Sequence, residues 1–216
     1  RDSRRSRVVG RSRPEAGEPA GIRIALFDSS SLVGKSLKSH LKQRKFPFEK
    51  VRAFDTGAVE EGGNLTDFDG EAMLAVRPDP DAMQYVDLAF YCGGYGTAAP
   101  YLDWPERYGF TAIDLSQTAN RKDGVRVVHP QVNPDALEGK AGLLAVPHPV
   151  SLFLSTLLAP LSRALPVTEA VAFVMQPASD KGEAGIEELY RQTVGVLNFT
   201  EVPQEQFGGV LAFNVM

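Results

Sequence analysis

A turn of four polar residues separates an apolar run from a helical pattern near the start of the chain. The run IRIALF (22–27) leads into DSSS (28–31), and the pattern LVGKSLKSHL begins at Leu32. At such a strand–turn–helix junction, glycines let a pyrophosphate approach the backbone N–H groups at the beginning of the helix. The candidate cofactor-binding positions of this junction are Asp28, Ser29, Ser30, Ser31, Val33 and Gly34.

Two side chains are candidate nucleophiles. Cys92, the only cysteine, ends an apolar run before Gly93-Gly94, which places it near the edge of a parallel sheet where ligands bind. A lone cysteine in this setting is more often a small buried hydrophobe than a reactive thiol. Ser151 follows His148, a candidate base, but a serine nucleophile also needs a group that orients the base, and the sequence shows none.

The composition limits the classes of function. The chain has 216 residues, of which 43% are hydrophobic and 23% are charged, as in ordinary globular proteins. The net charge of −4 gives no support to nucleic-acid binding, and no apolar run reaches the roughly 18 residues that span a membrane. A single cysteine excludes an intrachain disulfide and fits a reducing, cytoplasmic location.

Residues 1–21 differ in composition from the rest of the chain. They contain six arginines and carry a net charge of +3, and their few apolar residues predict a disordered Arg-rich tail. Arginine- and serine-rich sequences also occur in transit peptides. The remnant of such a peptide is therefore the alternative to a dispensable tail.

From residue 22 onward, strand-like and helix-like segments alternate, which predicts an α/β fold with a doubly wound, mostly parallel sheet. The strand-like runs lack clean alternation, as expected of strands that are buried on both faces. A polar hairpin with its turn at Asp69-Gly70 is predicted over 64–76. The predicted strands are 22–27, 51–54, 87–91, 111–114 and 143–146, and the predicted helices are 32–43, 97–108 and 151–164.

The pattern changes after Pro147 and Pro149. The helix over 151–164 is followed by a strand-like run over 167–175, a glycine-containing loop, a predicted helix over 185–197 and a further strand-like run over 210–216. A final strand with no successor would be an edge strand. We therefore expect the second domain to be incomplete in this sequence.

Several stretches, taken in order, resemble the aspartate-semialdehyde dehydrogenase family, whose members reduce aspartyl phosphate with a nicotinamide cofactor in amino-acid biosynthesis. They are FPFEKVRAF, DLAFYCGG, FTAIDLSQTANR, VVHPQVNPDALEGKAGLLAVPHP, FVMQPASDKGEAGIEEL and LAFNV. The resemblance implies a Rossmann-type NAD(P)-binding-like domain over 22–148 and a partial dimerisation domain over 149–216. It also implies a homodimer.

The resemblance places a catalytic cysteine at the beginning of the helix after Pro147, where the helix N-terminus stabilises a thiolate. This sequence has Pro149 at that position and His148 in place of the usual asparagine. Proline suits the first turn of a helix but offers no nucleophile. Gln176 matches a glutamine that orients the family's intermediate, so Pro149 and Gln176 are vestigial catalytic positions and no catalytic residue is assigned.

The family's cofactor is NADP, and the resemblance places the glycines of its first turn at Asp28, Ser31 and Gly34. The first two substitutions put side chains, one of them charged, where the pyrophosphate would lie. Each residue from 28 to 31 is also a candidate N-cap for the helix. The loop after the second strand offers no arginine for a 2′-phosphate, and its Asp55 is either a ribose-binding acid, which would allow NAD, or part of a solvated loop. We predict that no cofactor is bound.

These departures favour a non-catalytic homologue that acts as a binding or assembly protein, either with a second copy or with an unidentified protein partner. The alternative is an active NAD(P)-dependent oxidoreductase of the same family, which would need a different nucleophile. A third hypothesis is a small-molecule binding module in the vacated cleft, with His148 and Arg121 as candidate contacts.

Overall fold

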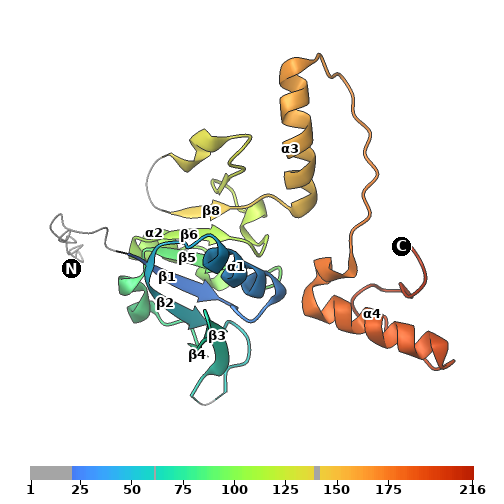
Figure 1. Ribbon diagram of the computed structural model, residues 1–216, viewed down its shortest axis with the longest axis horizontal. Helices are drawn as coiled ribbons and strands as arrows, with labels where there is room; N and C mark the ends of the chain where they lie inside the picture. Colours follow the sequence, from blue (N-terminus) through green and yellow to red (C-terminus); the bar gives the residue numbers. More distant parts are fainter. Residues whose placement is uncertain (1–20, 61, 139–141) are drawn as a thin grey trace, which may run out of the picture.

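A mixed sheet with helices on both faces forms the first part of the molecule (Figure 1). The computed structural model describes residues 21–60, 62–138 and 142–216, so the predicted tail over 1–21 lies outside the described residues except for Gly21. The strand order is β3-β4-β2-β1-β5-β6-β8-β7, and neighbouring strands are parallel except β3 and β4. This order confirms the predicted doubly wound α/β fold.

Most elements lie where the sequence predicts them. The strands are β1 (Ile22–Phe27), β2 (Phe48–Phe54), β3 (Asn64–Phe68), β4 (Glu71–Val76), β5 (Leu88–Tyr91), β6 (Thr111–Asp114), β7 (Arg126–Val127) and β8 (Leu143–Ala145). The α-helices are α1 (Leu32–Gln43), α2 (Trp104–Tyr108), α3 (Pro149–Ala164) and α4 (Gly182–Leu197). Short 3-10 helices are η1 (Pro80–Tyr85), η2 (Ala99–Tyr101), η3 (Ala119–Arg121), η4 (Pro134–Leu137) and η5 (Ala178–Lys181).

The central strand β1 divides the core between the two faces of the sheet, because successive side chains of a strand point to opposite sides. Ala25 and Phe27 pack on one face with η1 and α2, whereas Ile24 and Leu26 pack on the other face with Leu41 of α1. These four side chains of β1 are all buried. The turn after β1 is therefore held at the carboxyl edge of the sheet, between the ends of β2 and β5.

Two predictions between β2 and β6 had different outcomes. The hairpin over 64–76 is confirmed, with β3 and β4 antiparallel and Asp69 and Gly70 in the turn with positive φ. The single helix predicted over 97–108 is wrong, because η2 and the short α2 take its place. Pro105 lacks a backbone N–H and cannot continue a preceding helix, but it suits the first turn of a new one.

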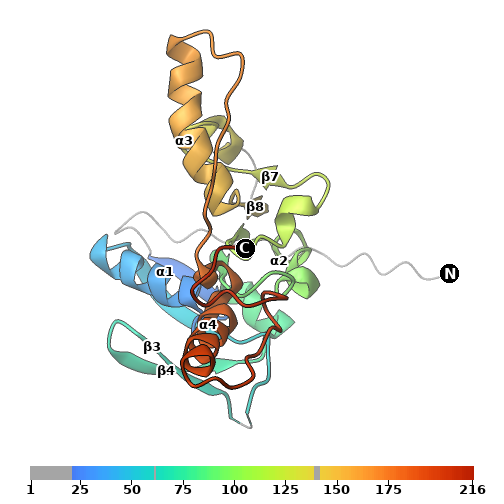
Figure 2. The ribbon, with the colours of Figure 1, turned by 90° about the vertical axis from the view of Figure 1, so that its right-hand side faces the viewer.

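The second part of the chain extends away from the sheet. Figures 1 and 2 both show α3 rising from the end of β8 and a long connection returning from it to α4. The beginning of α4 lies beside α1, where Glu183 forms an ion pair with Lys35 (2.6 Å). The connection includes the predicted strand 167–175, which pairs with no other strand in the described residues, so this prediction is wrong for the isolated chain. An extended segment without a neighbour has no ladder of backbone hydrogen bonds to make it a strand.

The other predicted strand, 210–216, is also wrong, and α4 explains why. Gln192 is fully buried, and its side-chain oxygen accepts hydrogen bonds from the N–H groups of Leu211 (2.7 Å) and Ala212 (3.2 Å). Its amide nitrogen donates to the carbonyl oxygens of Pro203 (2.7 Å) and Gly209 (2.9 Å). A side chain thus satisfies backbone groups that a strand partner would otherwise bind.

None of the helices in the described ranges 21–60, 62–138 and 142–216 has the length and apolar character needed to cross a membrane.

Candidate functional site

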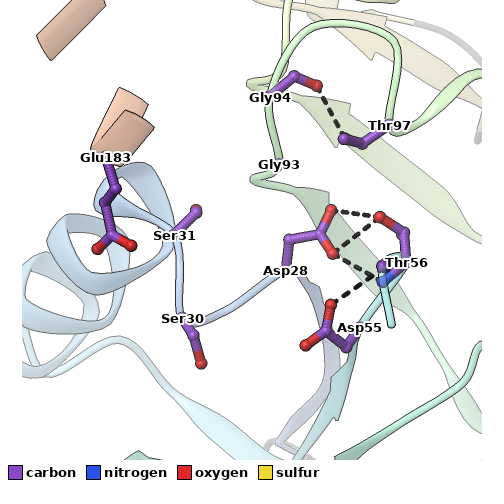
Figure 3. A pocket seen from close by; sticks show the side chains of 10 residues that line it. Asp28, Ser30, Ser31, Asp55, Thr56, Gly93, Gly94, Thr97 and Glu183 are labelled. Carbon is purple, nitrogen blue, oxygen red and sulfur yellow. Dashed lines mark hydrogen bonds between the residues drawn. The ribbon is translucent and has the colours of Figure 1, made fainter. Parts of the chain in front are cut away.

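A cavity of about 300 Å³ opens at the carboxyl ends of β1, β2 and β5, and we call it the strand-end cleft (Figure 3). In open α/β sheets, ligands bind in the crevice outside these strand ends. Its volume is at the lower end of the range for small-molecule pockets. The lining residues are Asp28, Ser30, Ser31, Asp55, Thr56, Gly57, Gly93, Gly94, Thr97 and Glu183.

Asp28 is the first residue after β1, and its side chain is fixed within the strand-end cleft. The carboxylate accepts hydrogen bonds from the Thr56 backbone N–H (2.7 Å) and from the Thr56 hydroxyl (2.9 Å). Burial raises the pKa of the Asp28 carboxyl, the hydrogen bonds from Thr56 counteract this rise in part, and the nearby Asp55 adds to it. The backbone of Asp28 has a φ of 54°, in the left-handed region that aspartate tolerates better than most residues.

Gly93 shows how closely the neighbouring strand approaches this carboxylate. A Cβ atom added at Gly93 would collide with an Asp28 carboxylate oxygen and with the Thr97 hydroxyl. Figure 3 shows the Asp28 side chain pointing toward Thr56, with Gly93 beside it. Asp28 therefore fills the space between the ends of β1, β2 and β5.

The N-cap of α1 is Ser31 and not Asp28. The Ser31 hydroxyl accepts a hydrogen bond from the Gly34 N–H (3.0 Å) and donates one to the Cys92 carbonyl oxygen (2.6 Å). Gly34 packs so tightly that a Cβ atom there would lie 2.6 Å from the Ser29 carbonyl oxygen. Gly34 thus keeps the close helix–strand contact that the third glycine of a dinucleotide-binding turn provides.

The remaining junction residues do not face the strand-end cleft in the same way. The Ser29 hydroxyl is buried 3.2 Å from the Thr66 hydroxyl, and Ser30 donates a weaker hydrogen bond to the same oxygen. Val33 is exposed and does not line the cleft. Three of the six predicted positions line the cleft: Asp28, Ser30 and Ser31. Ser29 and Gly34 support the turn, and Val33 is exposed outside the cleft.

The charges at the strand-end cleft are negative. Asp55 binds the Gly57 N–H and the Asn64 side chain, and Glu183 of α4 forms an ion pair with Lys35 (2.6 Å). Among the residues that line the cleft in the described structure, none is an arginine or a lysine. Of the three lining carboxylates a phosphate-bearing ligand would meet, only that of Glu183 is paired with a cation, Lys35, in the described part of the chain.

The beginning of α3 is a second cluster of predicted residues. Pro149 is the first residue of the helix, and His148 is its N-cap, with Nδ1 accepting a hydrogen bond from the Val150 N–H (3.3 Å). His148 Nε2 lies 3.4 Å from the Gln176 amide nitrogen and 3.6 Å from an Asp180 oxygen. The structure therefore places Gln176 next to His148, the residue that precedes Pro149, and Pro149 offers no nucleophile at the helix terminus.

The alternative nucleophiles are not positioned for chemistry. Cys92 is completely buried, and burial raises the pKa of its thiol to about 12, with further contributions from Asp28 and Asp114. No hydrogen bond joins the Ser151 hydroxyl to His148 in the described part of the chain. The Arg121 guanidinium lies 5.8 Å from the centre of the exposed Tyr95 ring and does not line the strand-end cleft.

Two residues near these sites were missed by the sequence reasoning. Asp114 is buried at the end of β6 and accepts hydrogen bonds from the Ser116 and Ala119 N–H groups, which shapes the loop before Arg121. The sequence signal that could have identified Asp114 is an aspartate at the end of an apolar strand, followed shortly by a serine. Glu183 lines the strand-end cleft from a helix far along the chain, and no local pattern predicts that contact.

Comparisons with known proteins identify the family to which this fold belongs. Residues 23–140 match the family model described as the NAD-binding domain of semialdehyde dehydrogenase. The chain is 28% identical over 194 residues to an aspartate-semialdehyde dehydrogenase of Prochlorococcus marinus, covering 90% of this chain and 56% of that protein. It is 26% identical to the Synechocystis enzyme, covering 91% of this chain and 58% of that protein.

Solved structures show the same fold. An aspartate semialdehyde dehydrogenase II of Vibrio cholerae superposes with a TM-score of 0.80 at 24% identity, over 91% of this chain and 58% of that one. A probable aspartate-semialdehyde dehydrogenase of Pseudomonas aeruginosa gives a TM-score of 0.72 at 24% identity, over 90% and 58%. The chain thus spans a little more than half the length of these relatives.

Proposed function

The chain belongs to the semialdehyde dehydrogenase family through its NAD-binding domain, and on this premise we propose that it is a non-catalytic member that acts by binding or assembly. The observation that carries the proposal is Pro149 at the first position of α3, beside His148 and Gln176. A thiolate at this terminus would be stabilised by the helix and would attack the substrate carbonyl. A proline ring carries no group that could be stabilised as an anion or attack a carbonyl.

The other nucleophiles do not replace the missing cysteine in this proposal. A thiol whose pKa is about 12 is almost entirely protonated at neutral pH, and the only cysteine, Cys92, is of this kind. Ser151 would need a base and an orienting group, and His148 is instead engaged as the N-cap of α3. Among the described residues, neither Cys92 nor Ser151 is therefore placed to carry the first step of the active-oxidoreductase alternative.

We also propose that neither NADP nor NAD is bound. The residues present do not fit the cofactor, because the Asp28 carboxylate is fixed where the turn would receive a pyrophosphate. The Ser31 hydroxyl already uses one of the N–H groups at the beginning of α1, and the strand-end cleft presents three carboxylates, Asp28, Asp55 and Glu183. Phosphate binding at a helix terminus depends on free N–H groups and on positive charge.

A second copy of the chain is the proposed partner, and residues 149–216 are its proposed dimerisation region. Phe153, Leu157 and Leu161 form an exposed stripe along α3, and Val171, Phe173 and Met175 alternate along the extended connection. Phe173 is 97% exposed. Contiguous exposed apolar surface of this kind marks interaction sites. A reducing, cytoplasmic setting remains the expectation, supported by the single buried cysteine.

Titration calorimetry with NADP and NAD tests the proposal that neither cofactor is bound. We expect no heat of binding up to about 1 mM, the upper end of ordinary enzyme affinities for their ligands. Phosphate-dependent oxidation of aspartate semialdehyde is assayed alongside. Sub-millimolar binding accompanied by turnover would overturn the proposal.

Light scattering coupled to gel filtration tests the partner. We expect a dimer for the wild type and a monomer for Phe173→Asp, because a carboxylate would be buried in the interface. Leu65→Asp is the control, since Leu65 is also a large exposed apolar residue (76%) but lies in β3, outside the proposed dimerisation region. A monomeric wild type, or equal effects of the two substitutions, would contradict a dimer through this region.

A further inference from the structure

Asp28 combines a charge, a fixed position and a left-handed backbone at one point of the strand-end cleft. We infer that Asp28 is the main obstacle in a dinucleotide cleft whose supporting framework is retained, so that removing its side chain reopens the cleft to phosphate-bearing ligands. This inference rests on the proposed absence of cofactor binding, and it adds the residue responsible for that absence.

The supporting framework of a dinucleotide cleft is present around Asp28. Helix α1 begins at the carboxyl end of β1, and Gly34 allows its close approach to the preceding turn. Gly93 and Gly94 follow β5 without side chains, and Asp55 follows β2, where dinucleotide-binding proteins carry the acid that binds the ribose hydroxyls. These parts would serve a dinucleotide if the space at the turn were free.

The Asp28 side chain cannot move aside easily. Its carboxylate is held by the backbone N–H and the hydroxyl of Thr56, and both anchor points belong to the end of β2. On the other side, the Gly93 backbone lies so close that a methyl group at Gly93 would collide with this carboxylate and with the Thr97 hydroxyl. The side chain is therefore part of the wall of the cleft.

Ser31 contributes less to the closure than Asp28. Its hydroxyl is turned toward the Cys92 carbonyl oxygen and the Gly34 N–H, so it behaves as an N-cap and carries no charge. A phosphate oxygen could take over the hydrogen bond from the Gly34 N–H, because helix N-terminal N–H groups bind anions readily. The charge and the occupied volume at Asp28 are the larger obstacle.

The test compares Asp28→Gly with a matched control. Asp69 has the same φ of 54° and also precedes a turn glycine, but it lies at the tip of the β3–β4 hairpin and does not line the strand-end cleft. Asp69→Gly therefore makes the same chemical change and gives the same backbone relief far from the site. Binding of NADP and NAD to each protein is measured by calorimetry and by quenching of the single tryptophan, Trp104.

We expect Asp28→Gly to bind at least one dinucleotide with a dissociation constant about tenfold or more below the limit of about 1 mM at which the wild type shows no binding, because one opposing charge is removed. Asp69→Gly is expected to behave as the wild type does. Asp28→Asn, which tolerates the left-handed backbone and keeps an acceptor for Thr56, is the second variant in case the glycine variant fails to fold. It should also gain affinity, though less than Asp28→Gly.

The two proposals fail in different ways. Dinucleotide binding by the wild type would overturn the proposed absence of a cofactor, and with it the closure by Asp28. A wild type that binds nothing, together with folded Asp28→Gly and Asp28→Asn proteins that also bind nothing, would overturn the proposal that Asp28 is the main obstacle. An equal gain in Asp69→Gly would overturn it as well, because the effect would then not come from the cleft.

Discussion

Asp28 begins the turn after β1 and Gly34 lies in the first turn of α1, and the sequence predicted their positions better than their contacts. The apolar run and the helical pattern placed both residues correctly at a strand–turn–helix junction. The sequence could not show that Asp28 binds Thr56 or that Ser31 rather than Asp28 caps α1, because each residue of DSSS is a good cap. The choice depends on the positions of β2 and β5, which local patterns do not contain.

Gly34→Ala tests the tight contact at the beginning of α1. An added Cβ atom would lie 2.6 to 2.8 Å from backbone atoms of Asp28 and Ser29, which cannot move as a flexible side chain would. Overpacking typically costs 1–3 kcal/mol and the better helix propensity of alanine returns up to about 1 kcal/mol, so we expect a net loss of about 1–2 kcal/mol in the free energy of unfolding.

Urea denaturation of Gly34→Ala and Gly94→Ala provides the comparison. Gly94 also lines the strand-end cleft, but a Cβ atom there would have no neighbour within 4 Å. Its replacement should leave stability unchanged within about 0.5 kcal/mol. Equal stability of the two variants would contradict the close packing of α1 on the turn.

Cys92 predicts a specific dependence of stability on pH. Burial raises the pKa of its thiol from 9.0 to about 12, so between these values the unfolded chain loses the proton while the folded chain keeps it. The stabilising contribution is therefore complete below pH 9 and is lost as the pH rises toward 12. Unfolding midpoints in urea should fall more steeply over this range for the wild type than for Cys92→Ala, and parallel curves would argue against the buried thiol.

At the scale of elements, burial and pairing decided which predictions succeeded. Strands β1, β2, β5, β6 and β8 and the helices α1, α3 and α4 were recognisable from apolar runs and periodicity, whereas the two-residue strand β7 was not predicted. The segments 167–175 and 210–216 have strand-like composition but form no strands, since one has no neighbour among the described residues and the other is bound by Gln192. Propensity cannot report whether a neighbouring strand exists.

Pro149→Cys tests whether the beginning of α3 can still activate a nucleophile. A thiol placed there would lie at the N-terminus of a sixteen-residue helix, which lowers the pKa of a thiol. We expect it to react with a disulfide reagent at neutral pH about tenfold faster than a thiol at Pro160→Cys, which lies near the other end of the same helix. Equal rates would show that the terminus offers no such stabilisation.

The hydrogen bonds of the Gln192 side chain hold the segment 203–212 against α4. Gln192→Ala removes four hydrogen bonds to the segment 203–212 and leaves buried backbone groups without partners, which costs about 1–3 kcal/mol. We expect faster proteolysis and faster amide exchange in 203–212. Arg191→Ala is the control, because Arg191 is exposed and its ion pair with Glu187 stays within α4. Unchanged protection in the glutamine variant would contradict this anchoring role.

At the scale of the whole molecule, the sheet domain and the second part of the chain differ in how much of their apolar surface is exposed to solvent. The sheet domain buries both faces of β1, whereas α3 has no buried residue and the connection to α4 exposes several large apolar side chains. The order of elements and the family resemblance were sufficient to predict the first domain. The exposed apolar surface could not be predicted, because it depends on which surfaces the chain leaves uncovered after folding.

The measurement that tests the central claim most directly is the phosphate-dependent oxidation of aspartate semialdehyde by the wild-type chain, followed by the absorbance of the reduced nicotinamide with NADP and with NAD. Ordinary enzymes turn over at roughly 10 per second, so even a 10⁴-fold loss is detectable at micromolar protein. With Pro149 at the helix terminus and Asp28 in the cleft, we predict no rate above that of a heat-denatured sample. A rate that is proportional to protein concentration and saturates with cofactor would contradict the account.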